Sequence, residues 1–196
     1  MSALLQEDTI PSKRGEALKR LNRYVEDLGQ RKKPMGSLEG FEREVHQLMA
    51  EVEQEVVAEG LSQFDMDAPV VEVDGRRYTQ VLRGPKRYLS AAGEVEVERS
   101  LYRAKPGEKA ICPLEMQAGI VDGYWTPLAA RQGVWVKAQL PPAEGEALFR
   151  EMGNMAPSKS SLDRLSRALG EGCGEGGTGR ALRRACVKPS GSRRGR

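Results

Sequence analysis

The sequence is poor in cysteine, histidine and aromatic residues. Its 196 residues include three cysteines and one histidine, and aromatic side chains make up 5% of the chain. No two cysteines form a CxxC pair, so a zinc finger or zinc ribbon cannot be completed. The odd number of thiols fits a reducing compartment better than a disulfide framework.

The sequence also has no long apolar run and no secretory signal. No stretch of about 18 apolar residues is present, which excludes a membrane-spanning helix. The first residues, MSALLQEDTIPSKRGE, carry acids where a signal peptide needs a basic start and an apolar stretch. We therefore expect a soluble, cytoplasmic protein that has no membrane partner.

Candidate catalytic residues are equally scarce. A catalytic triad would need His46, the only histidine, which lies beside polar residues of a helical pattern and is interpreted as solvated. Asp74 precedes a glycine, which is typical of a turn. Three glutamates alternate along a predicted strand, as on a solvated sheet face: Glu94, Glu96 and Glu98. We expect no catalytic residue and no bound cofactor.

The charge is distributed unevenly along the chain. Lysine and arginine number 31 against 28 acids, so the formal charge is +3. Residues 172–196 carry seven basic residues and one acid, which leaves a mildly acidic body. This glycine-rich segment has no core pattern, so we expect residues 171–196 to form a disordered basic tail with nonspecific affinity for nucleic acid. Out-of-frame translation of GC-rich DNA is the alternative interpretation.

The spacing of apolar residues predicts two amphipathic helices near the start of the chain, over residues 14–28 and 41–58. The apolar positions are Leu18, Leu21, Val25 and Leu28 in the first and Phe41, Val45, Leu48, Met49, Val52 and Val56 in the second. Ser37 is the expected N-cap of the second helix, and Gly60 its end. Residues 1–37 thus form one region, a helix with a basic linker.

An antiparallel sheet is predicted over residues 69–104, where apolar and polar residues alternate. Asp74-Gly75 is a strong hairpin turn, and Gly93 lies at or beside a second turn. Val95, Val97 and Leu101 are expected on the face opposite the three glutamates. The sheet should have three or four strands and one solvated face. With the preceding helix it makes a second region, residues 38–104.

A helical third region is predicted over residues 105–170, which makes the fold class α+β. Its helices cover residues 126–140, 142–152 and 158–169. The expected apolar positions are Leu128, Val134, Trp135 and Ala138 in the first, Ala147, Leu148 and Met152 in the second, and Leu162, Leu165 and Leu169 in the third. Gly153-Asn154 should end the middle helix.

The last two of these helices have the pattern of a helix-turn-helix, with a short turn and a capped polar second helix. Ser158 is the expected N-cap, and a cap there would also suit a phosphate at the helix N-terminus. The candidate DNA-binding residues are Lys159, Ser160, Arg164 and Arg167, whose groups hydrogen-bond phosphates and base edges. Any two packed helices with a solvated outer face would give a similar pattern.

The stretch from Leu38 to Leu169, about two thirds of the chain, resembles the amino-terminal part of insertion-sequence transposases of the ISKra type, a DDE class. The matching blocks are FEREVHQLM (41–49), DAPVVEVDGRRYTQVLR (67–83), GEVEVERSLYR (93–103), CPLEMQAGIVDGYWTPLAARQGVWV (112–136) and NMAPSKSSLDRLSRAL (154–169). The resemblance implies binding of double-stranded DNA at transposon ends, on the nucleoid.

The resemblance also implies a catalytic RNase-H-like domain beyond this region, whose acids hold divalent metal. No catalytic residue of this chain corresponds to them, so we expect a truncated or frameshifted fragment that is not an enzyme as it stands. Some relatives carry paired cysteines near the equivalent of Tyr102–Cys112, which suggests a zinc knuckle in them. This chain retains only Cys112 there, so we expect no metal site. The alternative function is a helical interaction protein or inhibitor that forms homo-oligomers or associates with a full-length transposase.

Overall fold

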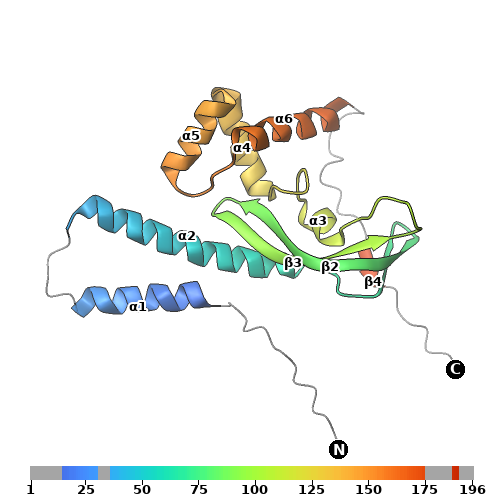
Figure 1. Cartoon of the computed structure of the whole chain (residues 1–196), viewed down its shortest axis with the longest axis horizontal. Coiled ribbons are helices and arrows are strands. Elements are labelled where there is room, and N and C mark those ends of the chain that lie inside the picture. Colours follow the sequence, from blue (N-terminus) through green and yellow to red (C-terminus); the bar gives the residue numbers. More distant parts are fainter. Residues whose placement is uncertain (1–14, 31–35, 175–186, 190–196) are drawn as a thin grey trace, which may run out of the picture.

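The computed structural model describes residues 15–30, 36–174 and 187–189 and shows a mixed helix and sheet chain, as predicted. A helical hairpin extends from one end of a curved antiparallel sheet, and a group of three helices lies above the same end of the sheet (Figure 1). None of the described helices is long and apolar enough to cross a membrane.

The helical hairpin consists of α1 (Glu16–Gln30) and α2 (Leu38–Ser62), which run antiparallel. Ser37 caps α2 as predicted, because its Oγ accepts a hydrogen bond from the Gly40 N–H at 3.1 Å. The predicted end at Gly60 is wrong, since the helix continues through Leu61. The buried Leu61 side chain packs on the sheet, and this burial outweighs the helix penalty of a glycine, about 1 kcal/mol.

The sheet has the strand order β3-β2-β1-β4, with all neighbours antiparallel. Its strands are β1 (Val70–Val73), β2 (Arg76–Ser90), β3 (Gly93–Arg103) and the short β4 (Val187–Pro189). The Asp74-Gly75 turn is confirmed, and its two positive φ angles of 50° and 79° are those of the turn that best matches strand twist. Gly93 follows the second turn with a φ of 120°.

The predicted solvated face covers only half of the long strands. Val95 and Val97 are buried against α2 and a short helix, α3 (Pro113–Ala118), while the three glutamates between and beside them are exposed. Further along β3, Ser100 and Tyr102 lie on the glutamate side and are completely buried. The segment that follows α2 covers them, because the Asp65 carboxylate accepts hydrogen bonds from the Ser100 N–H and Oγ–H.

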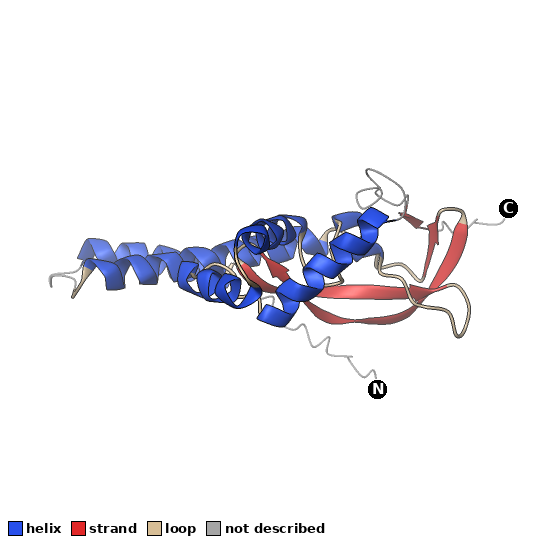
Figure 2. Ribbon diagram, turned by 90° about the horizontal axis from the view of Figure 1, so that it is seen from above, coloured by secondary structure: helices blue, strands red, loops and turns tan. Residues whose placement is uncertain are grey.

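Two pieces of the predicted basic tail are described. Residues 171–174 continue the last helix, and residues 187–189 form β4 on the free edge of β1. Figure 2 shows this short strand beside the far end of the sheet, away from the helical hairpin. The rest of the tail, residues 175–186 and 190–196, and with it the expected disorder, lies outside the described residues.

Candidate nucleic-acid interface

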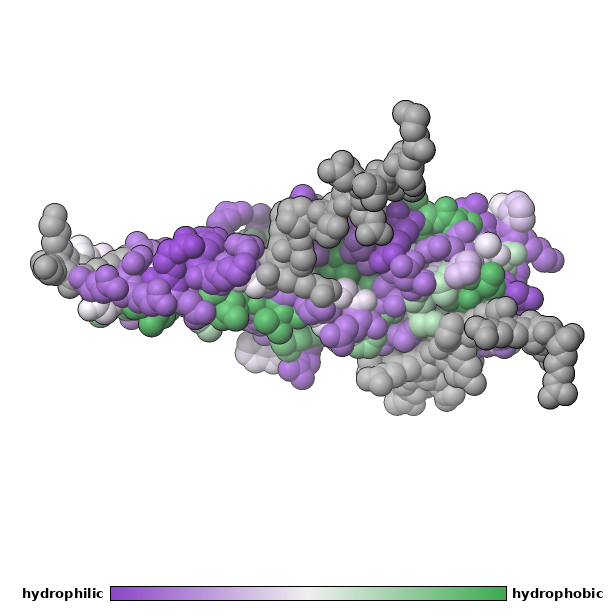
Figure 3. All heavy atoms as spheres, turned by 90° about the horizontal axis from the view of Figure 1, so that it is seen from below, coloured by the Kyte–Doolittle hydropathy of each residue, from purple (hydrophilic) through white to green (hydrophobic). Residues whose placement is uncertain are grey.

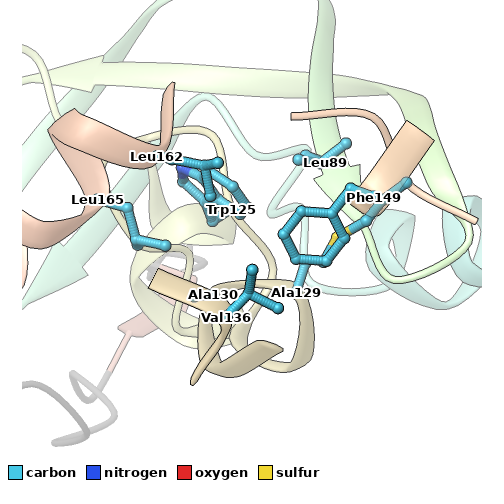
Figure 4. Packing of buried hydrophobic residues seen from close by; sticks show 9 residues of the cluster. Leu89, Trp125, Ala129, Ala130, Val136, Phe149, Leu162 and Leu165 are labelled. Carbon is cyan, nitrogen blue, oxygen red and sulfur yellow. The ribbon is translucent and has the colours of Figure 1, made fainter. Parts of the chain in front are cut away.

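Three helices pack around one apolar cluster above the sheet: α4 (Pro127–Gln139), α5 (Pro142–Met152) and α6 (Lys159–Gly174). We call this unit the three-helix group. Its buried residues are Leu89, Trp125, Ala129, Ala130, Val136, Phe149, Met155, Leu162 and Leu165. Figure 4 shows the labelled side chains pointing toward one another from the three helices, the β2 end and the loop before α4. The shared core fixes the direction in which each helix faces solvent.

The buried face of α4 differs from the prediction. The residues expected inside are exposed, namely Leu128, Val134, Trp135 and Ala138. The buried ones are Ala129, Ala130, Gly133 and Val136. A Cβ added to Gly133 would lie 2.8 Å from Leu165 Cδ2, so the two helices meet where α4 has almost no side chain.

The same correction applies to α5. Its bounds and its left-handed end at Gly153 are as predicted, with a φ of 74°. Its buried residues, however, are Gly145 and Phe149, while the three predicted ones, Ala147, Leu148 and Met152, are exposed. On α4 the contacts are made mainly by small residues, which give little apolar signal in the sequence. On α5 the prediction missed Phe149, a large apolar residue that lies one position after Leu148 and faces the core.

The helix α6 buries the side that its pattern predicted. Leu162 and Leu165 are 0% and 1% exposed. Ser158 is the N-cap, since its Oγ accepts a hydrogen bond from the Ser161 N–H at 3.2 Å. The connection from α5 spans residues 153–158, which is the stretch that the predicted helix bounds and the Ser158 cap leave between the two helices. The buried Met155 and Pro157 anchor this connection to the core.

All four predicted DNA-binding residues lie on the exposed side of α6: Lys159, Ser160, Arg164 and Arg167. The Arg164 Nε lies 3.8 Å from a carboxylate oxygen of Asp122 in the loop before α4. The acid on this side, Asp163, pairs with Lys137 of α4 at 2.9 Å, and the Lys137 hydrogen bond lowers the pKa of the Asp163 carboxyl. Asp163 is therefore held toward α4 by its own partner.

A carboxylate occupies the N-terminus of α6. Glu146 of α5 accepts a hydrogen bond from the Lys159 backbone N–H at 3.0 Å and pairs with Arg150 at 2.9 Å. The positive end of the helix dipole is thus already satisfied by an acid of the chain. A phosphate at this N-terminus would meet the negative charge of Glu146, so this part of the expectation is not favoured by the geometry.

Cys112 lies elsewhere, in the buried apolar cluster that packs α3 on the sheet, beside a small polar network. Glu115 accepts a hydrogen bond from the buried Tyr88 hydroxyl at 3.0 Å and lies 3.8 Å from Arg99. Burial raises the pKa of the Cys112 thiol and that of Tyr88. Within the described residues, no three side chains of His, Cys, Asp or Glu gather as metal ligands. The contacts of Cys112 are those of a packed core residue.

Comparisons with protein-family models, with curated protein sequences and with solved structures found no match to this chain.

Proposed function

We propose that this chain binds double-stranded DNA through α6, as the DNA-binding region of an insertion-sequence transposase. The observation that carries the proposal is the division of α6 into two sides. One side is held in the core by Leu162 and Leu165, and the other presents Lys159, Arg164 and Arg167 to solvent. A rigidly packed helix with a free basic side is the element that enters the major groove in helix-turn-helix proteins.

The roles of the exposed residues follow from their chemistry. Arg164 and Arg167 carry planar donors that can bind a guanine edge in two places, and they stand nearly one turn apart on α6. The exposed side chains of Lys159 and Ser160 suit phosphate oxygens at the groove wall, whereas the backbone N–H at the start of α6 is already bound by Glu146. The Asp122 contact of Arg164 is long and half exposed, so DNA can replace it at little cost.

The charges favour α6 over α5 as the helix that would lie against DNA. Along α5, three glutamates outnumber the single Arg150, whereas residues 159–170 of α6 carry three basic residues and one acid. In this proposal the chain recognises DNA, is retained on the nucleoid and does not itself cleave strands.

The test replaces the two arginines of α6. A randomised duplex library is selected on the wild-type chain, and affinity is then measured for a selected duplex and for a scrambled one. Arg164→Ala and Arg167→Ala should each weaken binding to the selected duplex by about 1–3 kcal/mol through a lost base contact. Binding to the scrambled duplex should change much less, and thermal melting should stay as in the wild type because both side chains are exposed.

Arg150→Ala is the matched control, since Arg150 is an exposed arginine of α5. It should leave the preference for the selected duplex intact. Normal affinity and normal melting of both α6 variants would show that this side of α6 is merely solvated. Failure of the library to enrich any sequence would likewise contradict the proposal.

The carboxylate at the N-terminus of α6 gives a prediction of opposite sign. Glu146→Gln removes a negative charge beside the proposed DNA surface, so affinity for all duplexes should rise, most strongly at low salt. Glu144 lies on the exposed side of α5, the helix that also carries Glu146, and Glu144→Gln should raise the affinity less. A gel-shift titration at two salt concentrations measures both variants. A Glu146→Gln affinity equal to that of the wild type at low salt would place DNA away from this helix end.

A further inference from the structure

One side of the helical hairpin carries exposed apolar side chains from both of its helices. They are Leu18 and Val25 on α1 and Leu38, Met49 and Val56 on α2, between 49% and 66% exposed. We call these five residues the hairpin face. Single exposed apolar residues are ordinary on a protein surface, but a continuous group of them marks a contact site.

The position of the hairpin face follows from an ion pair on the opposite side. Arg20 of α1 binds Glu51 of α2 at 2.5 Å. On α1, Leu18 stands two positions before Arg20 and Val25 five positions after it. On α2, Met49 and Val56 stand at the same distances along the sequence from Glu51. At about 100° per residue, both offsets turn the side chains away from the ion pair. Figure 3 shows hydrophobic atoms along one edge of the helical hairpin and hydrophilic atoms over the rest of the visible surface there.

The helical hairpin has little core of its own. Its buried residues are Ala17, Leu48 and Leu61, and Leu61 belongs to the contact with the sheet. The 25 residues of α2 extend over about 37 Å, so much of the hairpin projects beyond the body (Figure 1). Two helices cover each other on one side only, whereas four helices enclose a common apolar core.

Charge restricts what can cover the hairpin face. Residues 38–62 contain seven glutamates and one arginine, which is unsuitable for DNA or for an anionic membrane surface. Residues 16–30 are balanced, with three basic residues and three acids. A partner that presents both an apolar stripe and a neutral helix is therefore favoured, and α1 itself is such a helix.

We propose that a second copy of this chain packs on the hairpin face, with α1 of each copy lying over α2 of the other in a four-helix bundle. On each helix, one residue between the two apolar positions selects this pairing. On α1 it is Asn22, which lies between Leu18 and Val25. On α2 it is Glu53, which lies between Met49 and Val56. Two α2 helices would bring two Glu53 carboxylates together, whereas α1 over α2 offers the Asn22 amide to Glu53 of the second copy.

The oligomeric state of the full chain tests the proposal, which does not rest on DNA binding. Light scattering after size exclusion, up to about 100 μM, should give twice the 21.6 kDa of one chain, since a micromolar dimer is saturated there. Met49→Glu should weaken the dimer at least tenfold by placing a charge in the bundle core. Met152→Glu is the matched control, because Met152 is equally exposed but lies on α5. Circular dichroism confirms that both variants keep their helices.

A second variant tests which helices pair. Asn22→Lys should tighten the dimer if α1 lies over α2, since the ammonium group would face Glu53 of the second copy. If α1 paired with α1, the two lysines would repel and the dimer would weaken. A monomeric wild type over the whole concentration range, or a Met49→Glu variant as dimeric as the wild type, would overturn the proposal. Dissociation by Met152→Glu instead would also overturn it, because the contact would then lie on α5.

Discussion

Replacing Trp125 with alanine should lower the free energy of unfolding by about 3–5 kcal/mol, the largest loss expected from a single substitution in this chain. Trp125 is 0% exposed and lies at the centre of the three-helix group, between Leu162 and Leu165 of α6 and the small residues of α4 (Figure 4). Its removal leaves a cavity that rigid helices cannot fill. Urea unfolding at one fixed protein concentration measures the change.

The second tryptophan provides the control. Trp135 is 70% exposed on α4, so Trp135→Ala should change the stability by no more than about 0.5 kcal/mol. Trp125→Phe should cost much less than Trp125→Ala, because the Trp125 indole N–H has no hydrogen-bond partner among the described residues and none is lost. Equal losses from Trp125→Ala and Trp135→Ala would show that α4 is turned as its sequence pattern alone suggested.

Replacing Leu165 with alanine should lower the free energy of unfolding by about 2–5 kcal/mol. Leu165 is 1% exposed and fills the space beside Gly133, where α4 and α6 approach most closely. Calorimetric melting should show a lower transition temperature. At a temperature where the variant remains folded, its affinity for the selected duplex should equal that of the wild type, because Leu165 faces away from the proposed DNA surface.

Leu128→Ala is the matched control for this substitution, since Leu128 is 45% exposed on α4. It should melt nearly as the wild type does. Together with Arg164→Ala, the pair separates scaffold from recognition, because one variant loses stability and the other loses affinity. A folded Leu165→Ala variant with weakened DNA binding would mean that this side of α6 also contributes to the interface.

The sequence alone determined the features that depend on local backbone chemistry. Asp74-Gly75 and Gly153 take positive φ angles where the sequence placed a turn and a helix end. Ser37 and Ser158 cap the helices that follow them, as predicted. Capping is predictable because it joins a hydroxyl to a backbone N–H group only two or three residues further along the chain. The existence and order of the five longer helices and of the long strands followed from the same short-range signals, whereas the short α3 was not predicted.

The exposed residues of the candidate interface were also predictable, whereas their partners were not. The side of α6 opposite its leucines must be polar if the leucines are buried, and this placed Arg164 and Arg167 correctly in solvent. Asp122 and Glu146 reach α6 from other elements. No spacing within the helix signals these contacts, because they depend on how the chain folds back.

Only the tertiary structure decided which faces of α4 and α5 are buried and where the solvated side of the sheet ends. Helical spacing favours large apolar residues, yet α4 meets α6 at Gly133, where the absence of a side chain permits close approach. Likewise, the segment after α2 covers Ser100 and Tyr102 through hydrogen bonds across more than thirty residues of sequence. Which face of a helix is buried depends on how well that face fits the surface of an element far away in the sequence. Apolar periodicity in one segment carries no information about the shape of another segment.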